Sequence, residues 1–258
     1  MGPAQRRPHP TVLGSSLMRR LLTTISCLLL GVAFAQGAQA ATPLQIAPQQ
    51  ELVGLLHSAS VRASPDGSVE ETVAANRPIT RERTVLPVLA AVIDNSVDAK
   101  GQLWLQVRLP GRVVGQQAPP ETGWISASST LISTTAWHLV VELGARRVLV
   151  YDAGVRVRSY EAVVGKPSTP TPTGEYFVEE NVKMAAGAPG APFALASSDR
   201  SAVLHEFEGG PGQIAIHGIE NLGGTLGTAE SHGCIRLATS AITWIAARVG
   251  PGVPITIV

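Results

Sequence analysis

The heptapeptide "SHGCIRL", residues 231–237, holds the only cysteine of the chain outside its N-terminal apolar segment. The other cysteine, Cys27, lies inside that segment. A chain that loses Cys27 keeps one thiol and forms no intramolecular disulfide, so Cys234 is expected either to pair between chains or to be a reactive thiol. Two neighbours favour reactivity: His232 is a candidate base, and Gly233 lets the backbone turn closely around the thiol.

Residues 1–40 have the organisation of an export signal. The pair Arg19–Arg20 precedes a mostly apolar run of 15 residues, 21–35, and small residues follow it. This order predicts cleavage after Ala40, with Met18 as a possible true start, and localisation in the periplasm or cell wall. The run is shorter than the ~20 apolar residues of a membrane-spanning helix, so no stable membrane insertion is expected after cleavage. An uncleaved anchor is the alternative.

The composition of the chain favours a mainly β fold. The 258 residues suffice for one large or two small domains, and a formal net charge of +1 gives no reason to expect a nucleic-acid partner. Aromatic residues make up only 4%, while 26 glycines and 19 prolines punctuate the sequence. Such punctuation is typical of short strands joined by many turns.

Residues 60–130 are predicted to form a small β-domain, and residues 41–59 a linker that leads into it. The segment "LWLQVRLPGR" alternates, so that Leu103, Leu105 and Val107 lie on one face of a strand. Short strands with Gly and Pro turns favour a small barrel. The order "VRASP", "VLPVLA", "WLQVRLPGR" and "GWI" resembles bacterial SH3-like domains, which implies either wall binding or a spacer without a ligand of its own.

Residues 136–258 are predicted to form a second, denser β-domain. A hairpin is expected at Gly144–Ala145, and one helix near Thr239 to Val249, because Ile242, Ile245, Ala246 and Val249 share a face. Gly250 and Pro251 follow that helix and end it. The remaining strands are expected within residues 155–165, 175–181, 202–207, 213–218 and 253–258.

Candidates for cysteine-based catalysis lie close together in the second domain. A cysteine nucleophile needs a base within hydrogen-bond reach and backbone N–H donors that face the developing oxyanion. Cys234 is the candidate nucleophile, and His217, 17 residues earlier, is the candidate base. A zinc site of His217, His232 and Cys234 is an alternative, but it lacks the paired spacing usual for zinc.

The histidine followed by "SHGCIRL" resembles the signature of the L,D-transpeptidases, also called YkuD-domain proteins. A second landmark of that family resembles "VVGKPSTPTPTGEYFV", residues 163–178, in which a Thr-Pro-Thr-Gly turn enters a strand. The resemblance covers roughly residues 137–258. Together with the SH3-like resemblance of residues 60–130, it implies the fold class: mainly β, with a small SH3-like barrel followed by a β-rich YkuD catalytic domain with one or few short helices.

The resemblance also implies roles for the residues of the motif. Cys234 would attack the peptide bond before the terminal D-Ala of a peptidoglycan tetrapeptide, and His217 would be its general base. His232 and Gly233, with Cys234, would line the oxyanion pocket through their N–H groups, and the carbonyl of Gly218 would orient His217. Ser231 would shape the loop, and Arg236 would support the loop or meet a substrate carboxylate. The list of implied site residues is therefore Cys234, His217, His232, Gly233, Gly218, Ser231 and Arg236.

The implied reaction forms a thioester on the cysteine, releases D-Ala and ends in a 3→3 cross-link with the amine of a second stem peptide. Donor and acceptor stem peptides are then the partners, and no cofactor is expected. Three alternatives remain open. Water as acceptor would give an L,D-carboxypeptidase, the same chemistry would attach a protein to the wall, and an idle catalytic domain would leave a wall-binding protein.

Overall fold

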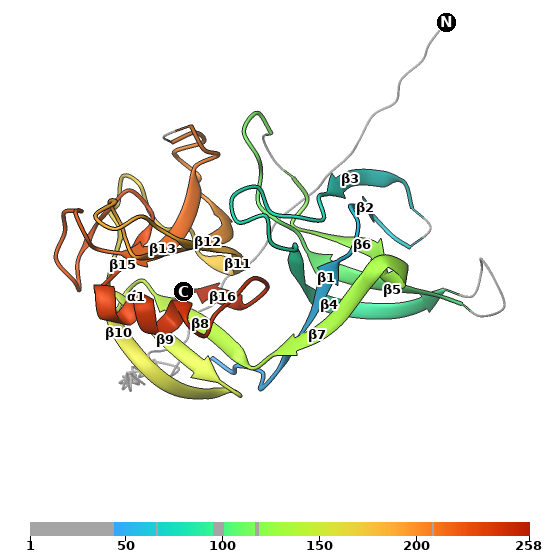
Figure 1. Cartoon of the computed structure of the whole chain (residues 1–258), viewed down its shortest axis with the longest axis horizontal. Coiled ribbons are helices and arrows are strands. Elements are labelled where there is room, and N and C mark those ends of the chain that lie inside the picture. The colour runs from blue at the N-terminus through green and yellow to red at the C-terminus, as the bar shows by residue number, and fades with distance from the viewer. Residues whose placement is uncertain (1–43, 66, 95–100, 117–118, 208) are drawn as a thin grey trace, which may run out of the picture. The chain divides into compact units, whose positions relative to one another are not determined.

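The computed structural model describes residues 44–65, 67–94, 101–116, 119–207 and 209–258, and the predicted export signal lies outside them. These residues form two sheets (Figure 1). The first contains β1 (Gln50–Leu55), β2 (Ala59–Arg62), β3 (Val69–Val73), β4 (Val85–Asp94), β5 (Gln102–Arg108), β6 (Thr122–Ser126) and β7 (Thr130–Thr135), with a 3₁₀ turn at Ala127–Ser129. The second contains β8 (Trp137–Glu142), β9 (Arg147–Asp152), β10 (Val155–Gly165), β11 (Gly174–Lys183), β12 (Phe193–Arg200), β13 (Gln213–Gly218), β14 (Ala229–Ser231), β15 (Ile235–Leu237) and β16 (Pro254–Ile257), with helix α1 (Thr239–Ala246).

The first sheet, which we call the N-terminal lobe, has the strand order β3-β2-β6-β5-β4-β1-β7 and antiparallel pairing throughout. The alternation predicted for β5 is confirmed, because Leu105 and Val107 are buried in the core of this lobe and Leu103 packs against it. Phe177 from β11 of the second sheet belongs to the same core. The assignment of this lobe to the SH3-like domains stays a prediction.

The predicted linker 41–59 differs from the structure in its second half. Strand β1 occupies Gln50–Leu55 and lies between β4 and β7, so it is an interior strand of the N-terminal lobe. Its last four residues, Leu52 to Leu55, are all buried. A short continuous apolar run has no period-two alternation, and therefore it gives no strand signal from periodicity alone.

The second sheet, which we call the C-terminal lobe, closes on itself (Figure 1). Its order is β14-β10-β15-β13-β12-β11-β16-β8-β9, and β9 also pairs with β10. The hairpin predicted at Gly144–Ala145 is confirmed, since β8 and β9 pair from Trp137↔Asp152 to Glu142↔Arg147. The ring brings two short strands from different parts of the sequence, β13 and β15, into parallel contact.

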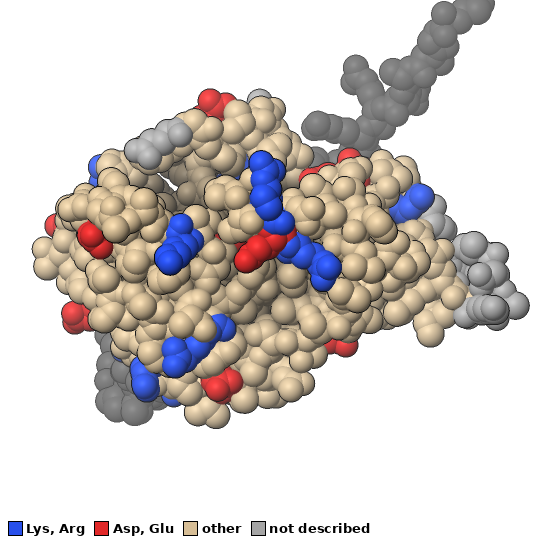
Figure 2. Space-filling view, viewed as in Figure 1, with Lys and Arg blue, Asp and Glu red and all other residues tan. Residues whose placement is uncertain are grey.

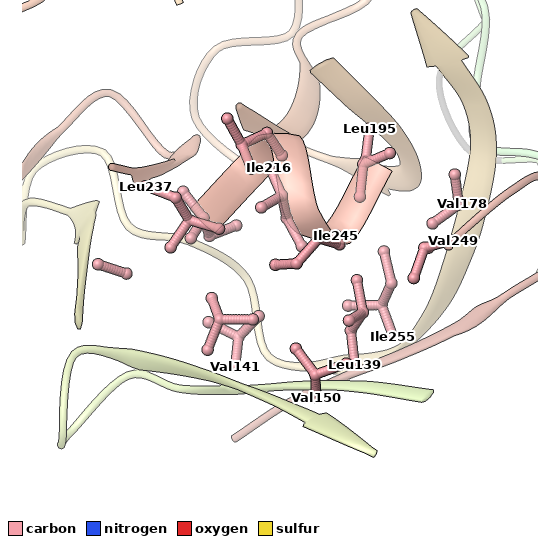
Figure 3. Packing of buried hydrophobic residues seen from close by; sticks show 14 of the residues in the cluster. Leu139, Val141, Val150, Val178, Leu195, Ile216, Leu237, Ile245, Val249 and Ile255 are labelled. Carbon is pink, nitrogen blue, oxygen red and sulfur yellow. The ribbon is translucent and has the colours of Figure 1, made fainter. Parts of the chain in front are cut away.

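The core of the C-terminal lobe is aliphatic, and α1 contributes to it (Figure 3). The helix buries Ala241, Ile242 and Ile245 against residues of the ring such as Leu139 and Ile216. The predicted helix is confirmed from Thr239, although its regular part ends at Ala246. Val249, beyond that end, is also buried in the core.

One predicted strand in the C-terminal lobe is wrong. Residues 202–207 form no strand, and Phe207 makes only an isolated bridge with Gly210. The strand of this region is β12, Phe193–Arg200, just before it. The sequence hides β12 because Ser197, Ser198 and Asp199 are buried polar residues, at 8% exposure or less. The hydroxyls of the two serines bond the backbone of Ile214 and Phe177, which are remote in sequence.

No helix within the described ranges is long and apolar enough to cross a membrane. Figure 2 shows lysines and arginines scattered among acidic residues on the face that it presents, without a single-sign patch. That distribution accords with the formal net charge of +1.

Candidate active site

Cys234 and His217 share one face of two neighbouring strands. Strands β13 and β15 run parallel with His217 opposite Arg236 and Ile216 opposite Ile235. Ile216 and Ile235 are buried in the core, whereas His217 and Arg236 are partly exposed on the other face. Cys234 comes directly before Ile235 and is also partly exposed. Alternation therefore places the thiol diagonally across from the imidazole, on the outer face of the ring.

The catalytic loop, residues 231–234, is closed by the side chain of Ser231. This serine is fully buried, and its hydroxyl donates to the Cys234 carbonyl at 2.6 Å. The hydroxyl oxygen of Ser231 also accepts the N–H of Gly233 at 3.1 Å. Gly233 has a φ of +121°, and a side chain there would lie 2.8 Å from Ile214 Cδ1, so only glycine fits. Ser231 thus shapes the loop, and the Gly233 N–H is engaged within it.

Two threonines of the second sequence landmark, Thr169 and Thr171, clamp the catalytic loop from outside. The Thr169 hydroxyl donates to the Ser231 carbonyl at 3.2 Å. The Thr171 hydroxyl donates to the Gly233 carbonyl at 2.6 Å and accepts the N–H of Gly165 at 3.0 Å. Both threonines are buried. Residues 169–171 therefore fix the backbone on either side of His232.

The ring of His217 is oriented by the backbone carbonyl of Gly218, 2.7 Å from Nδ1. Since a carbonyl only accepts, Nδ1 carries the proton and Nε2 keeps a lone pair. Burial lowers the pKa of His217 below its usual value, and the charge of Arg236 lowers it further, while the hydrogen bond to Gly218 opposes both. The lowered pKa favours the neutral imidazole, whose Nε2 can accept a proton.

The loop between β11 and β12 packs against His217 from the side. Gly190 has a φ of +86°, and a Cβ there would lie 2.8 Å from His217 Nδ1. Its carbonyl accepts the N–H of Gly218 at 2.8 Å. A Cβ on Gly218 would lie 1.9 Å from the Ala191 carbonyl oxygen, so this position has no room for a side chain. Two glycines thus let the loop cover one edge of the base.

Arg236 and His232 lie at the margins of the site. Arg236 Nη1 donates to the Gly223 carbonyl at 2.5 Å, which ties the loop after β13 to β15. His232 is exposed and stacks on Phe207, with ring centroids 6.1 Å apart. Its Nε2 lies 3.4 Å from Lys166 Nζ. His232 therefore faces solvent beside a cation, whereas His217 faces the interior of the site.

The structure adds residues that the sequence analysis did not single out. Lys166, Thr169 and Thr171 lie in a quoted landmark but received no role. Gln213 opens a predicted strand without a role of its own, and nothing in the sequence pattern marked Gly190. Within the described part of the chain, no three His, Cys, Asp or Glu side chains are grouped to hold a metal ion. The arrangement that remains is a thiol, a neutral imidazole and a rigid backbone loop.

A mainly β fold with this thiol–imidazole pair defines a candidate cysteine active site, and comparison with known sequences shows which catalytic domain it resembles. The sequence model of the L,D-transpeptidase catalytic domain, YkuD, matches residues 136–257, just under half of the chain. The C-terminal lobe is therefore similar to the catalytic domain of the L,D-transpeptidases.

Two curated relatives carry the same family name. The YkuD protein of Bacillus subtilis (strain 168) is 29% identical over 124 residues, which are 48% of this chain and 67% of that protein. The YkuD protein of Bacillus licheniformis is 29% identical over 142 residues, which are 52% of this chain and 78% of that protein.

Solved structures of L,D-transpeptidases are more distant. The Mycobacterium smegmatis enzyme is 19% identical with a TM-score of 0.37, and the match covers 67% of this chain and 99% of that one. A mutant of the Enterococcus faecium enzyme is 21% identical with a TM-score of 0.37, covering 47% of this chain and 49% of that one. The match thus spans about half the length of the Enterococcus protein.

Proposed function

We propose that the protein is an exported L,D-transpeptidase that forms 3→3 peptidoglycan cross-links through a thioester on Cys234. The observation that carries the proposal is the shared outer face of β13 and β15, where Cys234 lies diagonally across from a neutral His217. The family of the catalytic domain supports the substrate class. Export is inferred from the N-terminal signal in the sequence.

In the first half of the proposed reaction, His217 Nε2 accepts the proton of the Cys234 thiol. The thiolate then attacks the carbonyl between the L-centre of diaminopimelate and the terminal D-Ala. The imidazolium returns the proton to the amine of D-Ala as the C–N bond breaks. D-Ala leaves, and the acyl group stays on sulfur as a thioester.

In the second half, a side-chain amine of another stem peptide attacks the thioester. Its proton passes to His217, the C–S bond breaks, and the protonated imidazole restores the thiol of Cys234. Because the Gly218 carbonyl holds the same tautomer throughout, Nε2 serves as base and acid in both halves.

The oxyanion that forms in each half needs backbone donors beside the thiol. The family resemblance points to the N–H groups of His232, Gly233 and Cys234. Since the Gly233 N–H donates to Ser231, we assign the oxyanion pocket to the N–H groups of His232 and Cys234 and give Gly233 a conformational role.

Intact-mass spectrometry tests the proposal. The mature chain is incubated with a disaccharide-tetrapeptide, and we expect a mass increase equal to the acyl group with D-Ala released. Cys234→Ala should abolish the adduct, and His217→Asn should slow its formation by ~10²–10⁴-fold, the usual contribution of a general base. His57→Asn, an exposed histidine of the N-terminal lobe, is the control that should react normally. An adduct that persists in Cys234→Ala would exclude this nucleophile.

The acceptor is tested by product analysis with and without a second stem peptide. A cross-linked dimer that appears only with the acceptor supports a transpeptidase. A tripeptide as the main product in the presence of acceptor would instead identify an L,D-carboxypeptidase.

A further inference from the structure

Two adjacent glutamates of β11 cross from the C-terminal lobe into the N-terminal lobe. Val178 pairs with Ser197 but Glu180 pairs with Ala196, so Glu179 is the extra residue of a β-bulge. A bulge re-aims side chains, and here both carboxylates point out of the ring. Glu179 Oε1 accepts the N–H of Gly111 at 2.8 Å, and Glu180 Oε2 accepts two backbone N–H groups of the loop before β4, at 3.1 and 2.8 Å.

Glu179 is the centre of a buried ionic cluster at this junction. Its side chain is 0% exposed, and it binds Arg77 of the N-terminal lobe and Arg200 of β12, which are 12% and 7% exposed. Arg200 also donates to the Arg112 carbonyl at 3.0 Å, a second link to the N-terminal lobe. Because desolvation offsets most of the attraction in such clusters, their contribution lies more in fixing one arrangement than in net stability.

The same cluster reaches Gln213, the first residue of β13. The pairing of β12 with β13 is interrupted between Ala196 and Arg200, so the start of β13 has a gap in its backbone ladder. Side chains bridge this gap. Gln213 Nε2 donates to the Ser197 carbonyl at 2.9 Å and lies 3.4 Å from Glu179 Oε2, and the Ser197 hydroxyl donates to the Ile214 carbonyl at 2.7 Å.

The start of β13 touches the nucleophile. The carbonyl oxygen of Gln213 lies 4.0 Å from Cys234 Sγ, at the outer limit of a weak S–H···O contact. His217 is four residues further along the same strand. A displacement of β13 therefore changes the setting of the thiol and the position of the base together.

We propose that Gln213 is a positioning residue for Cys234 and His217, and that the N-terminal lobe acts on the reaction through the contacts Arg77–Glu179–Gln213. The proposal rests on Cys234 being the nucleophile. In this arrangement the N-terminal lobe is part of the catalytic apparatus, because it neutralises the carboxylate that anchors the strand carrying the base.

A double-mutant cycle in the full chain tests the coupling. Arg77→Ala removes the lobe's cation, and Gln213→Met removes the amide at similar volume. Small misplacements of reacting groups cost up to ~100-fold, so we expect each variant to lower kcat for D-Ala release by about tenfold, with KM little changed. Residues of one network are not additive, so the double variant should lose about tenfold as well, rather than about 100-fold.

Two further variants serve as a rescue and a control for the double-mutant cycle. Arg77→Lys keeps a cation at the junction and should recover most of the lost kcat. Arg81→Ala makes the same change at an exposed arginine of the same loop and should behave as the wild type. Losses that multiply in the double variant would overturn the proposal, because they would show that Arg77 and Gln213 act independently.

Alkylation of the thiol by iodoacetamide gives a readout that needs no peptidoglycan. We expect both single variants to change the pH profile of Cys234 alkylation in folded protein. A lower Tm with an unchanged profile and unchanged kcat would reduce the junction to a structural role and overturn the proposal. Normal alkylation of the wild type without D-Ala release would overturn the proposed function instead, while the coupling would still be measurable.

Discussion

The catalytic loop and the lobe junction both hold backbone beside Cys234, but they do so by opposite chemistry. At the loop, neutral hydroxyls of Thr169, Thr171 and Ser231 bind carbonyl oxygens. At the junction, Glu179 is fully buried between two arginines. Hydroxyls cost little to bury when they are bonded, whereas a buried charge depends wholly on its partner. The junction is therefore the stronger constraint and also the more easily broken one.

The largest effect is expected when the charge at the junction is removed. Glu179→Gln leaves Arg77 and Arg200 without their shared carboxylate, and breaking a buried pair costs about 3–5 kcal/mol. The measurement is the free energy of unfolding in urea. Glu142→Gln is the control, because its ion pair with Arg147 is partly exposed, at 41% and 29%, and should contribute less. If the two variants lose the same free energy of unfolding, the buried ion pairs at the junction are no more important for stability than the partly exposed pair.

A smaller effect is expected at the loop. Thr171→Val removes the hydroxyl that serves both Gly233 and Gly165, and unsatisfied buried groups of this kind cost about 1–3 kcal/mol. We expect a lower Tm and slower acylation of Cys234, because the loop backbone is released. Thr173→Val changes the same residue type at an exposed position and should leave acylation unchanged.

Two glycines of one loop separate backbone strain from contact with the base. Gly190 and Gly187 have φ values of +86° and +77°, so alanine costs each about 1–2 kcal/mol. Only at Gly190 does the new Cβ meet His217, whereas at Gly187 nothing lies within 4 Å. We expect similar losses of stability but a loss of turnover in Gly190→Ala alone. Equal turnover in both variants would show that the loop does not constrain the base.

The smallest effect concerns pH. Because burial and Arg236 lower the pKa of His217, the base stays neutral below the ordinary histidine value of about 6.5, and the acidic limb of kcat/KM should lie below that pH. Arg236→Met should move the limb to higher pH, and Arg236→Lys should leave it in place. Because the pKa of His217 is lower in the folded state than in the unfolded chain, the free energy of unfolding should decrease as pH falls below the unfolded-state pKa of this residue. If Arg236→Met leaves the acidic limb of kcat/KM at the same pH, burial alone accounts for the lowered pKa of His217.

The sequence predicts the candidate site residues Cys234 and His217 better than it predicts the contacts that hold them in place. The Cys234 motif, His217, the β8–β9 hairpin and α1 are readable because they are local patterns or family signatures. Glu179 and Glu180 look like the polar end of a strand, and only a bulge on β11 and a remote loop make them buried. The sequence also gives no sign of a role for Gln213, since that role depends on an interruption in the pairing of β12 with β13.

The closed ring of the C-terminal lobe has a consequence for how a peptide docks. Strands β13 and β15 each lie between two neighbours, so neither presents a free edge beside Cys234. Many peptide-binding domains recognise an extended chain by adding it as a further strand at such an edge. Neither β13 nor β15 is open to that mode, so under the proposed function a stem peptide contacts the outer face of these strands through side chains and the N–H groups of the catalytic loop, and among the described strands of this lobe only β14, at the end of the strand order, keeps an unpaired side.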